Sequence, residues 1–149
     1  MAPSKYGDDF EVGQVFATQG LTVTESHLVS WAGLTGDFYP LHMDDEYARR
    51  TQFGERLAHG PMIFALAVGL VALAGFAGDS AIAWLGVDDM RMQGPVRIGD
   101  TVRVAVTVKS RQPTSNPRKG LQVWHYAVSN QRGETVLEFD YKLMFHMRG

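Results

Sequence analysis

The feature of this sequence that most limits its fold is an apolar run from Met62 to Ala77 without a charged or polar side chain. The run is shorter than the roughly 20 residues that a helix needs to cross a bilayer, and Gly69 and Gly75 interrupt it. Gly60-Pro61 fits a helix start directly before it, because proline suits the first helical turn and glycine leaves the neighbouring amide open. We therefore expect a buried core helix and no membrane association.

Strand-like segments fill the chain after this run. The clearest is Thr101 to Lys109, which alternates almost perfectly between apolar and polar residues, as a strand with one wet face does. The segments are Ala81–Met92, Asp100–Gln112, Gly120–Asn130 and Glu134–Met147, with a hairpin expected at Asn130–Gly133. One apolar helix followed by antiparallel strands predicts an α+β fold in which the sheet wraps around the helix.

The first part of the chain has signals for shorter elements. Val15 to Val23 alternates loosely and predicts a strand. Thr24 then caps a short helix that ends near Gly36. Asp44-Asp45-Glu46 resembles the acid-rich first turn of another short helix. These elements lead into and out of the segment around residues 35–42.

Composition describes one ordinary folded domain over residues 1–149, since 45% of the residues are apolar and 20% are charged. The net charge of −2 gives no basic surface for nucleic acid, and we expect no such partner. The absence of cysteine excludes disulfides, thiolate metal sites and a cysteine nucleophile. The first fourteen residues lack the apolar core of a signal peptide, and we expect a cytoplasmic protein.

Asp37 and His42 bracket a turn that the sequence makes rigid. Pro40 fixes its own φ and favours an extended Tyr39, so we expect the spacing between the two polar residues to be non-helical. The amide of Gly60, at the start of the long helix, offers a free N–H and a partial positive charge. A base, an acid and an anion site are the groups needed to move a proton next to a carbonyl.

Simpler explanations exist for each residue alone. Asp37 could form only an Asx-turn, and His42 could be a buried histidine with its hydrogen bonds satisfied. We expect His59 to bond a backbone group of the loop. A metal site from His42, Asp44 and His59 is conceivable, but the spacing does not bring three ligands to one place, and we expect no metal. The other histidines, expected to have no function, are His27, His125 and His146.

Taken together, the chain resembles the MaoC-like dehydratase family, the hot-dog-fold (R)-specific enoyl-CoA hydratases, over nearly its whole length. The resemblance rests on Gly36-Asp37 before Pro40-Leu41-His42, Ala58-His59-Gly60, Pro95–Asp100 and Asn130–Gly133, in that order. It implies a hot-dog fold, an antiparallel sheet around a long apolar helix. It also implies hydration of a 2-enoyl thioester, or the reverse dehydration of a 3-hydroxyacyl thioester.

The resemblance assigns catalytic roles to Asp37, His42 and Gly60. The first two act on a water molecule and on the substrate's α-carbon, and the Gly60 amide holds the thioester oxygen. The resemblance implies coenzyme A as part of the substrate, and we expect no separate cofactor. It also implies a homodimer or a higher homo-oligomer, because sheets of this fold pair edge to edge.

Two positions depart from the family pattern. The family commonly has Asn where this chain has Tyr39, and well-known members have Ser where this chain has Ala65. We expect Tyr39, Ala65 and His59 to contact substrate, and the first two to set the preferred chain length.

Two other functions compete with hydration. A hot-dog acyl-CoA thioesterase generally has an acidic residue on the long helix, and Met62 to Ala77 has none. A non-catalytic acyl-thioester binding subunit has no need for both Asp37 and His42. The acyl chain, the choice between coenzyme A and a carrier protein, and the physiological direction stay open at this point.

Overall fold

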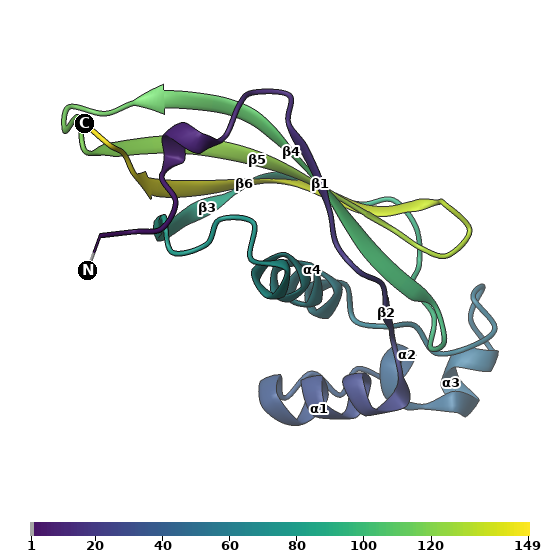
Figure 1. Cartoon of the computed structure of the whole chain (residues 1–149). Coiled ribbons are helices and arrows are strands. Elements are labelled where there is room, and N and C mark those ends of the chain that lie inside the picture. The colour runs from purple at the N-terminus through teal and green to yellow at the C-terminus, as the bar shows by residue number, and fades with distance from the viewer. Residues whose placement is uncertain (1) are drawn as a thin grey trace.

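The computed structural model describes residues 2–149, and Met1, part of the predicted single domain, lies outside them. A curved antiparallel sheet covers one central helix, and shorter helices lie on the far side of that helix (Figure 1). The elements are a 3₁₀ turn (Gly7–Asp9), β1 (Val15–Ala17), β2 (Leu21–Thr22), α1 (Glu25–Thr35), α2 (Pro40–Met43), α3 (Asp45–Arg49), α4 (Gly60–Ala74), β3 (Ala81–Met92), β4 (Thr101–Pro113), β5 (Lys119–Ser129) and β6 (Thr135–His146).

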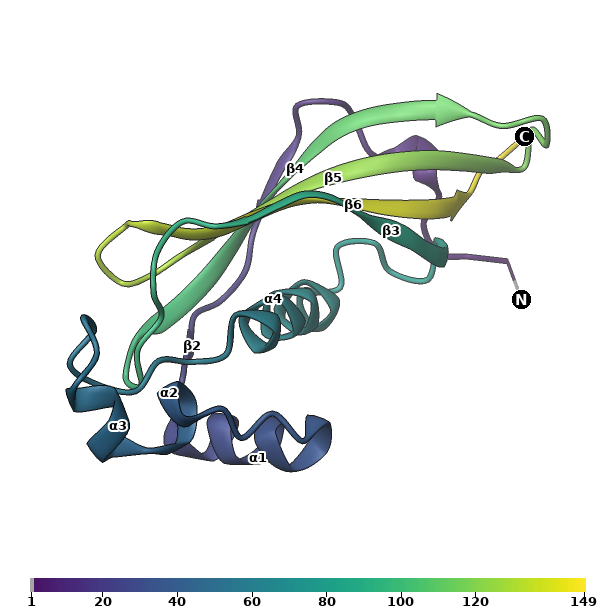
Figure 2. The same ribbon diagram turned by 180° about the vertical axis from the view of Figure 1, so that it is seen from behind.

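The sheet confirms the predicted strands to within two residues at each end. Its strand order is β1-β4-β5-β6-β3, with the short β2 also paired to β4, and every pair is antiparallel. β4 alternates as its sequence predicts, because Val102, Val104 and Val106 are buried while Arg103 and Ala105 are exposed. β3 forms one edge of the sheet, as the view from behind shows (Figure 2).

α4 is the predicted buried helix, and it ends three residues before the apolar run does. Ile63 and Ala67 are fully buried beneath the sheet. The helix ends because Gly75 adopts a left-handed φ of 69° and its N–H bonds the Ala72 carbonyl. Of the described residues, 2–149, no helix is long and apolar enough to cross a membrane.

The strand predicted from Val15 to Val23 is wrong as one element, because it divides into β1 and β2. Thr18 lies between the two pieces, and its N–H donates to the Val104 carbonyl over 2.9 Å. The Val104 N–H donates in turn to Thr18 Oγ1, also over 2.9 Å. Thr18 Oγ1 thus takes the place of a backbone carbonyl as the acceptor for the Val104 N–H. The regular pairing with β4 is interrupted at this point.

The start of α1 gives His27 a structural role that the sequence did not predict. Thr24 is the N-cap, and its N–H donates to His27 Nδ1 over 2.9 Å. The helix ends at Gly36, which has a left-handed φ of 81°. This end delivers the chain directly to Asp37.

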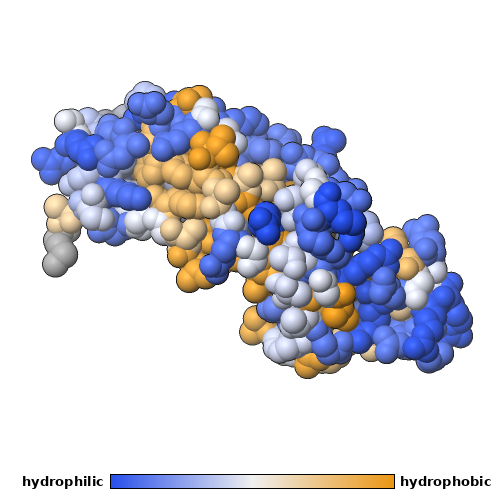
Figure 3. Space-filling model, turned by 45° about the vertical axis from the view of Figure 1, so that its right-hand side comes forward, coloured by the Kyte–Doolittle hydropathy of each residue, from blue (hydrophilic) through white to orange (hydrophobic). Residues whose placement is uncertain are grey.

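The core lies between α4 and the concave face of the sheet. The largest fully buried aromatic side chains come from β5 and β6, and they are Trp124, Tyr126, Phe139 and Phe145. In the space-filling view, exposed hydrophobic residues gather between the sheet and the helical region, while hydrophilic residues cover both ends (Figure 3).

Candidate active site

Three segments converge near the start of α4: the loop after α1, the short helix α2, and the residues that open α4. They bring Asp37, His42 and His59 together, so that one polar atom from each lies within 4.8 Å of the others. The predicted non-helical spacing is right for Tyr39, which is extended at φ −54° and ψ 133°. The spacing from Asp37 to His42 is therefore not that of one helix, although His42 itself lies on the short helix α2, which Pro40 starts.

His42 is held in one orientation by a backbone group. Its Nδ1 lies 2.7 Å from the Leu57 carbonyl, which can only accept, so Nδ1 carries the proton and donates. The other ring nitrogen, Nε2, is left with a free lone pair in the neutral ring. The half-buried His42 can therefore take a proton from a bound water molecule.

His59 is fully buried against His42. Its Nε2–H donates to the Asp37 carbonyl over 3.0 Å, which confirms the predicted bond to a backbone group of the loop. Its ring stacks on His42 with centroids 4.1 Å apart and planes inclined by 28°. Burial lowers the pKa of His59, and proximity to His42 lowers it further, so this ring is neutral at pH 7.

Asp37 forms the Asx-turn that its position alone suggested. Its Oδ1 accepts a bond from the Tyr39 N–H over 3.3 Å, and its own N–H donates to Thr35 Oγ1 over 3.2 Å. Asp37 is half-buried, and its carboxylate lies beside His42. The turn occupies only Oδ1, so Oδ2 can still accept hydrogen bonds. The turn and a catalytic role are therefore compatible.

A groove of about 380 Å³ runs past His42 and Gly60. Its walls are mostly apolar, and its other lining residues are Phe53, Leu57, Ala58 and the segment Met92 to Val96. Gly60 is the first residue of α4. The N–H groups of a helix's first turn have no carbonyl within the helix to donate to, so the Gly60 N–H is free to bind a ligand. Two of the predicted catalytic residues, His42 and Gly60, thus line the groove, and Asp37 lies beside His42.

The predicted substrate-binding residues are placed differently from one another. Tyr39 is 54% exposed, and its ring lies edge-on to His42 with centroids 6.1 Å apart. His59 lies behind His42, and Ala65 is half-buried one turn into α4; neither is among the residues lining the groove. Tyr39 does not line the groove either, and His59, stacked on His42, lies nearer the catalytic pair than Tyr39 does.

The cluster of Asp37, His42 and His59 has metal-binding residue types, and one ligand atom from each lies within 4.8 Å of the others. The two imidazole planes are stacked and only 28° from parallel, and stacked rings do not favour binding of both to one zinc ion, because ligand lone pairs lie in the ring planes. The absence of a metal stays a prediction. Asp44, considered as a ligand from sequence, instead caps α3 by accepting the Tyr47 N–H over 3.0 Å.

Arg56 supports the site and was missed by sequence reasoning. Its guanidinium donates to Asp45 over 2.6 Å, to Glu25 over 3.0 Å, and to the His42 carbonyl over 3.4 Å. These acceptors lie on three different helices, so one side chain ties α1, α2 and α3 together. Glu25 is the main reason that the pKa of Arg56 is raised. No local pattern signals such a network, because its members are distant in sequence.

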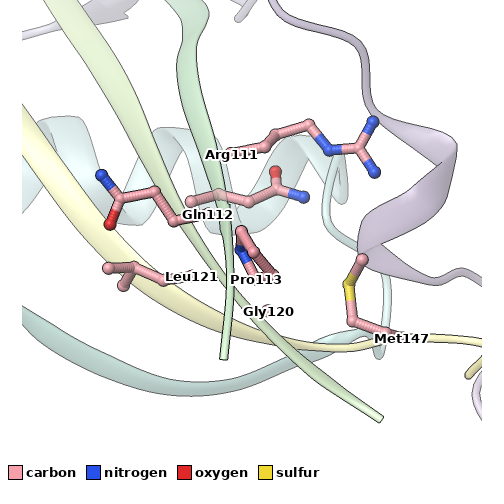
Figure 4. Close-up of a pocket in the computed structure, with 7 residues that line it drawn as sticks. Arg111, Gln112, Pro113, Gly120, Leu121 and Met147 are labelled. Atoms are coloured by element: carbon pink, nitrogen blue, oxygen red, sulfur yellow. The ribbon is translucent and has the colours of Figure 1, made fainter. Parts of the chain in front are cut away.

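A second hollow, of about 310 Å³, lies at the opposite end of the sheet near the C-terminus (Figure 4). It is lined by Arg111, Met147 and their neighbours on β4 and β5. Gln122 in this hollow is already engaged, since it donates to the Gly7 carbonyl and accepts from the Trp124 indole. Its polar groups serve to hold the N-terminal turn against the sheet.

Comparison with known proteins gives the family. The MaoC-like domain family matches residues 9–127. The chain belongs to the MaoC-like dehydratase family. The (R)-specific enoyl-CoA hydratase of Rhodospirillum rubrum is 33% identical to this MaoC-like chain over 144 residues, which cover 97% of the chain and 94% of that relative. Protein MaoC of Klebsiella aerogenes is 32% identical over 143 residues, covering 91% of the chain but only 42% of that relative.

Solved structures show the same architecture. A protein of Archaeoglobus described as a monoamine oxidase regulatory protein superposes on this MaoC-like chain with a TM-score of 0.92. The two are 33% identical, with 97% of this chain and 96% of the other covered. A Mycobacterium tuberculosis protein described as a double hotdog fold matches with a TM-score of 0.85 at 22% identity, covering 96% of this chain and 44% of the other. The fold is therefore an α+β hot-dog fold, as predicted.

Proposed function

We propose that this MaoC-like protein hydrates a 2-enoyl thioester of coenzyme A to the (R)-3-hydroxyacyl thioester, and catalyses the reverse dehydration. The observation that carries the proposal is the pairing of Asp37 with His42 beside a groove that Gly60 also lines. The relative named as an (R)-specific enoyl-CoA hydratase, 33% identical over 97% of this chain, supports it.

The geometry suits a water molecule held between two acceptors. His42 Nε2 and an Asp37 carboxylate oxygen can each accept one of its hydrogens, which turns the water's oxygen lone pair toward the groove. The oxygen then bonds C3 of the substrate, one water proton passes to the Asp37/His42 pair, and C2 receives a proton from that pair. Because both groups lie on one side, addition is syn.

Gly60 provides the electrophilic part of the reaction. As the water attacks, negative charge develops on the thioester oxygen, and an N–H at the start of α4 can donate to it. Removal of one such donor in other enzymes costs about 3–4 kcal/mol of transition-state stabilisation. Thioester hydrolysis is the weaker candidate, because α4 has no acidic residue from Gly60 to Ala74.

Crotonyl-CoA tests this assignment directly. Hydration removes the absorbance of the conjugated double bond without releasing thiol, whereas hydrolysis releases free coenzyme A. Chiral analysis of the product should give the (R)-3-hydroxybutyryl thioester. Release of thiol without loss of the enoyl group would replace hydration by hydrolysis, and no change in either signal would support a binding subunit.

We further propose that the working unit is a homodimer paired through β3. This edge strand presents exposed Trp84, Leu85 and Met92, which are 55%, 51% and 47% exposed in the single chain. An apolar sheet edge is a template for pairing with a second copy. Light scattering at micromolar concentration should give twice the chain mass of 16.5 kDa, and a monomer would contradict the proposal. The cytoplasmic location stays a prediction.

A further inference from the structure

The backbone of Asp37 is held at both ends by side chains from other segments. Its N–H donates to Thr35 Oγ1 over 3.2 Å, and its carbonyl accepts from His59 Nε2–H over 3.0 Å. Thr35 is the last residue of α1, and His59 directly precedes α4. Asp37 is therefore fixed between two helices, although it lies in neither of them.

The hydroxyl group of Thr35 is oriented by a second hydrogen bond. It donates its proton to the Trp31 carbonyl, one turn back in α1, over 2.7 Å. Because a hydroxyl group has one proton and two lone pairs, it can accept from Asp37 at the same time. The same helix is anchored in the core by Leu28 and Ala32, which are both fully buried. The Thr35 hydroxyl thus connects the Asp37 amide to a helix whose inner face is packed in the core.

The neighbouring amides of the loop do not depend on Thr35. The N–H groups of Gly36 and Phe38 donate to backbone carbonyls, over 2.8 and 3.0 Å. The N–H of Tyr39 donates to Asp37 Oδ1. Removal of the Thr35 hydroxyl therefore frees the Asp37 amide directly and leaves the acceptors of the other three amides in place.

The position of this amide matters because it fixes the carboxylate. The Asp37 carboxylate lies beside His42, and a water molecule held between the two needs both acceptors in place. A shift of the Asp37 backbone moves the carboxylate with it, and a misplacement of about 1 Å can lower a rate by roughly 10²-fold. A bond that holds only the backbone can therefore control the reaction.

On the basis of the hydration proposed above, we propose that Thr35 is a positioning residue for this reaction, whose hydroxyl group holds the Asp37 carboxylate in place beside His42. It acts through the Asp37 amide and does not touch substrate. A threonine that only bonded the Trp31 carbonyl, as helical threonines commonly do, would affect the helix and not the reaction. The two roles therefore differ in their effect on kcat.

Two variants of Thr35 separate its hydroxyl group from its shape. Thr35→Val has the shape of threonine without the hydroxyl, and Thr35→Ser keeps the hydroxyl without the methyl group. With crotonyl-CoA, we expect Thr35→Val to lower kcat by roughly 10- to 100-fold and to change KM by less than about twofold. Thr35→Ser should keep kcat within about threefold of the wild-type value, because the hydroxyl still accepts from Asp37.

Thr114→Val is the matched control. Thr114 Oγ1 accepts from the Asn116 N–H over 3.2 Å, and its hydroxyl donates to the Lys119 carbonyl over 2.8 Å. These are the same kinds of bond as those of Thr35, but they lie in the β4–β5 loop, away from the groove. Thr114→Val should therefore keep the wild-type kcat, and a loss equal to that of Thr35→Val would overturn the proposal.

Amide hydrogen exchange, measured by NMR, tests the bond itself without requiring catalysis. Exchange at Asp37 should be roughly 2- to 12-fold faster in Thr35→Val than in the wild type, which is the range for one net hydrogen bond. Exchange at Gly36, whose N–H donates to a backbone carbonyl, is the internal reference and should not change. Unchanged exchange at Asp37 would overturn the proposal.

A cycle with Asp37→Asn shows whether Thr35 acts through Asp37. In the Asp37→Asn background, assayed at high enzyme concentration, Thr35→Val should lower kcat by less than about twofold, because the group that it positions no longer takes a proton. An equal fold loss in both backgrounds would overturn the proposal, and so would wild-type kcat in Thr35→Val. Absence of hydration by the wild type would refute the proposed function together with this role, whereas an active wild type with an unaffected Thr35→Val would refute the role of Thr35 alone.

Discussion

Replacing His59 separates two contacts that hold the catalytic loop. His59→Phe keeps an aromatic ring to stack on His42 but loses the N–H that donates to the Asp37 carbonyl over 3.0 Å. His59→Gln does the reverse, because its amide nitrogen reaches the position of Nε2 but it has no ring. The pair of variants therefore assigns the loop's position either to the hydrogen bond or to the stack.

The expected losses follow from the geometry. One net hydrogen bond contributes about 0.5–1.5 kcal/mol to the free energy of unfolding, so His59→Phe should lower Tm by several degrees. A loop that moves Asp37 by about 1 Å should lose up to roughly 10²-fold in kcat. Because His59 does not touch substrate in the proposed mechanism, KM should change much less than kcat. Steady-state hydration of crotonyl-CoA measures both constants.

The pH dependence of stability gives an independent signature. Burial lowers the pKa of His59 below 6.5, so the unfolded chain takes up a proton at this residue before the folded protein does. His59 therefore contributes stability that is present above about pH 6.5 and is lost as pH falls through its folded pKa. In His59→Phe this titration is absent, so the Tm difference from wild type should be largest near pH 8 and smaller near pH 5.5. A variant with wild-type kcat and a pH-independent Tm difference would refute this reasoning.

Two further variants test the supporting residues. Arg56→Lys keeps the positive charge but loses the planar guanidinium whose hydrogen bonds join three helices. We expect the free energy of unfolding, measured by urea titration, to fall by on the order of 1 kcal/mol, and kcat to be lower. Arg118→Lys, in the β4–β5 loop, is its control, and an equal loss in both would contradict the role of Arg56. In Gly60→Ala the new methyl group meets Met92 at 3.6 Å, an ordinary contact, so the fold should survive. The methyl group narrows the groove, and kcat/KM for crotonyl-CoA should fall about tenfold or more; an unchanged value would place the substrate elsewhere.

Much of the fold was predictable because its signals are local. The alternation in β4 and the uncharged run in α4 are visible in consecutive residues, and both elements form where predicted. The break at Thr18 was not predictable, because it depends on a bond to Val104 on another strand. The end of α4 could not be predicted, because either Gly69 or Gly75 could adopt the left-handed φ that ends a helix; in the structure Gly75 does.

The site was predictable in its residues but not in its construction. Asp37, His42 and Gly60 were chosen from a spacing and a family resemblance; the fold places His42 and Gly60 on one groove and Asp37 beside His42. The stack of His59 on His42 and the network of Arg56 join residues that are 11 to 31 positions apart, so no local pattern signals them. Their roles, like those of the catalytic residues, stay predictions until variants are measured.

The most direct measurement of the central claim is kcat for crotonyl-CoA hydration in a cycle of Asp37→Asn, His42→Asn and the double variant. Asp37→Asn keeps an oxygen for the Tyr39 N–H, and His42→Asn keeps an amide at the Nδ1 position for the Leu57 carbonyl, so thermal melts should stay near wild type. Each single change should lower kcat by about 10²–10⁴, and the double change little more, because the two groups act as a unit. Near-wild-type hydration by Asp37→Asn, or a loss of activity that follows a collapsed melt, would contradict the account.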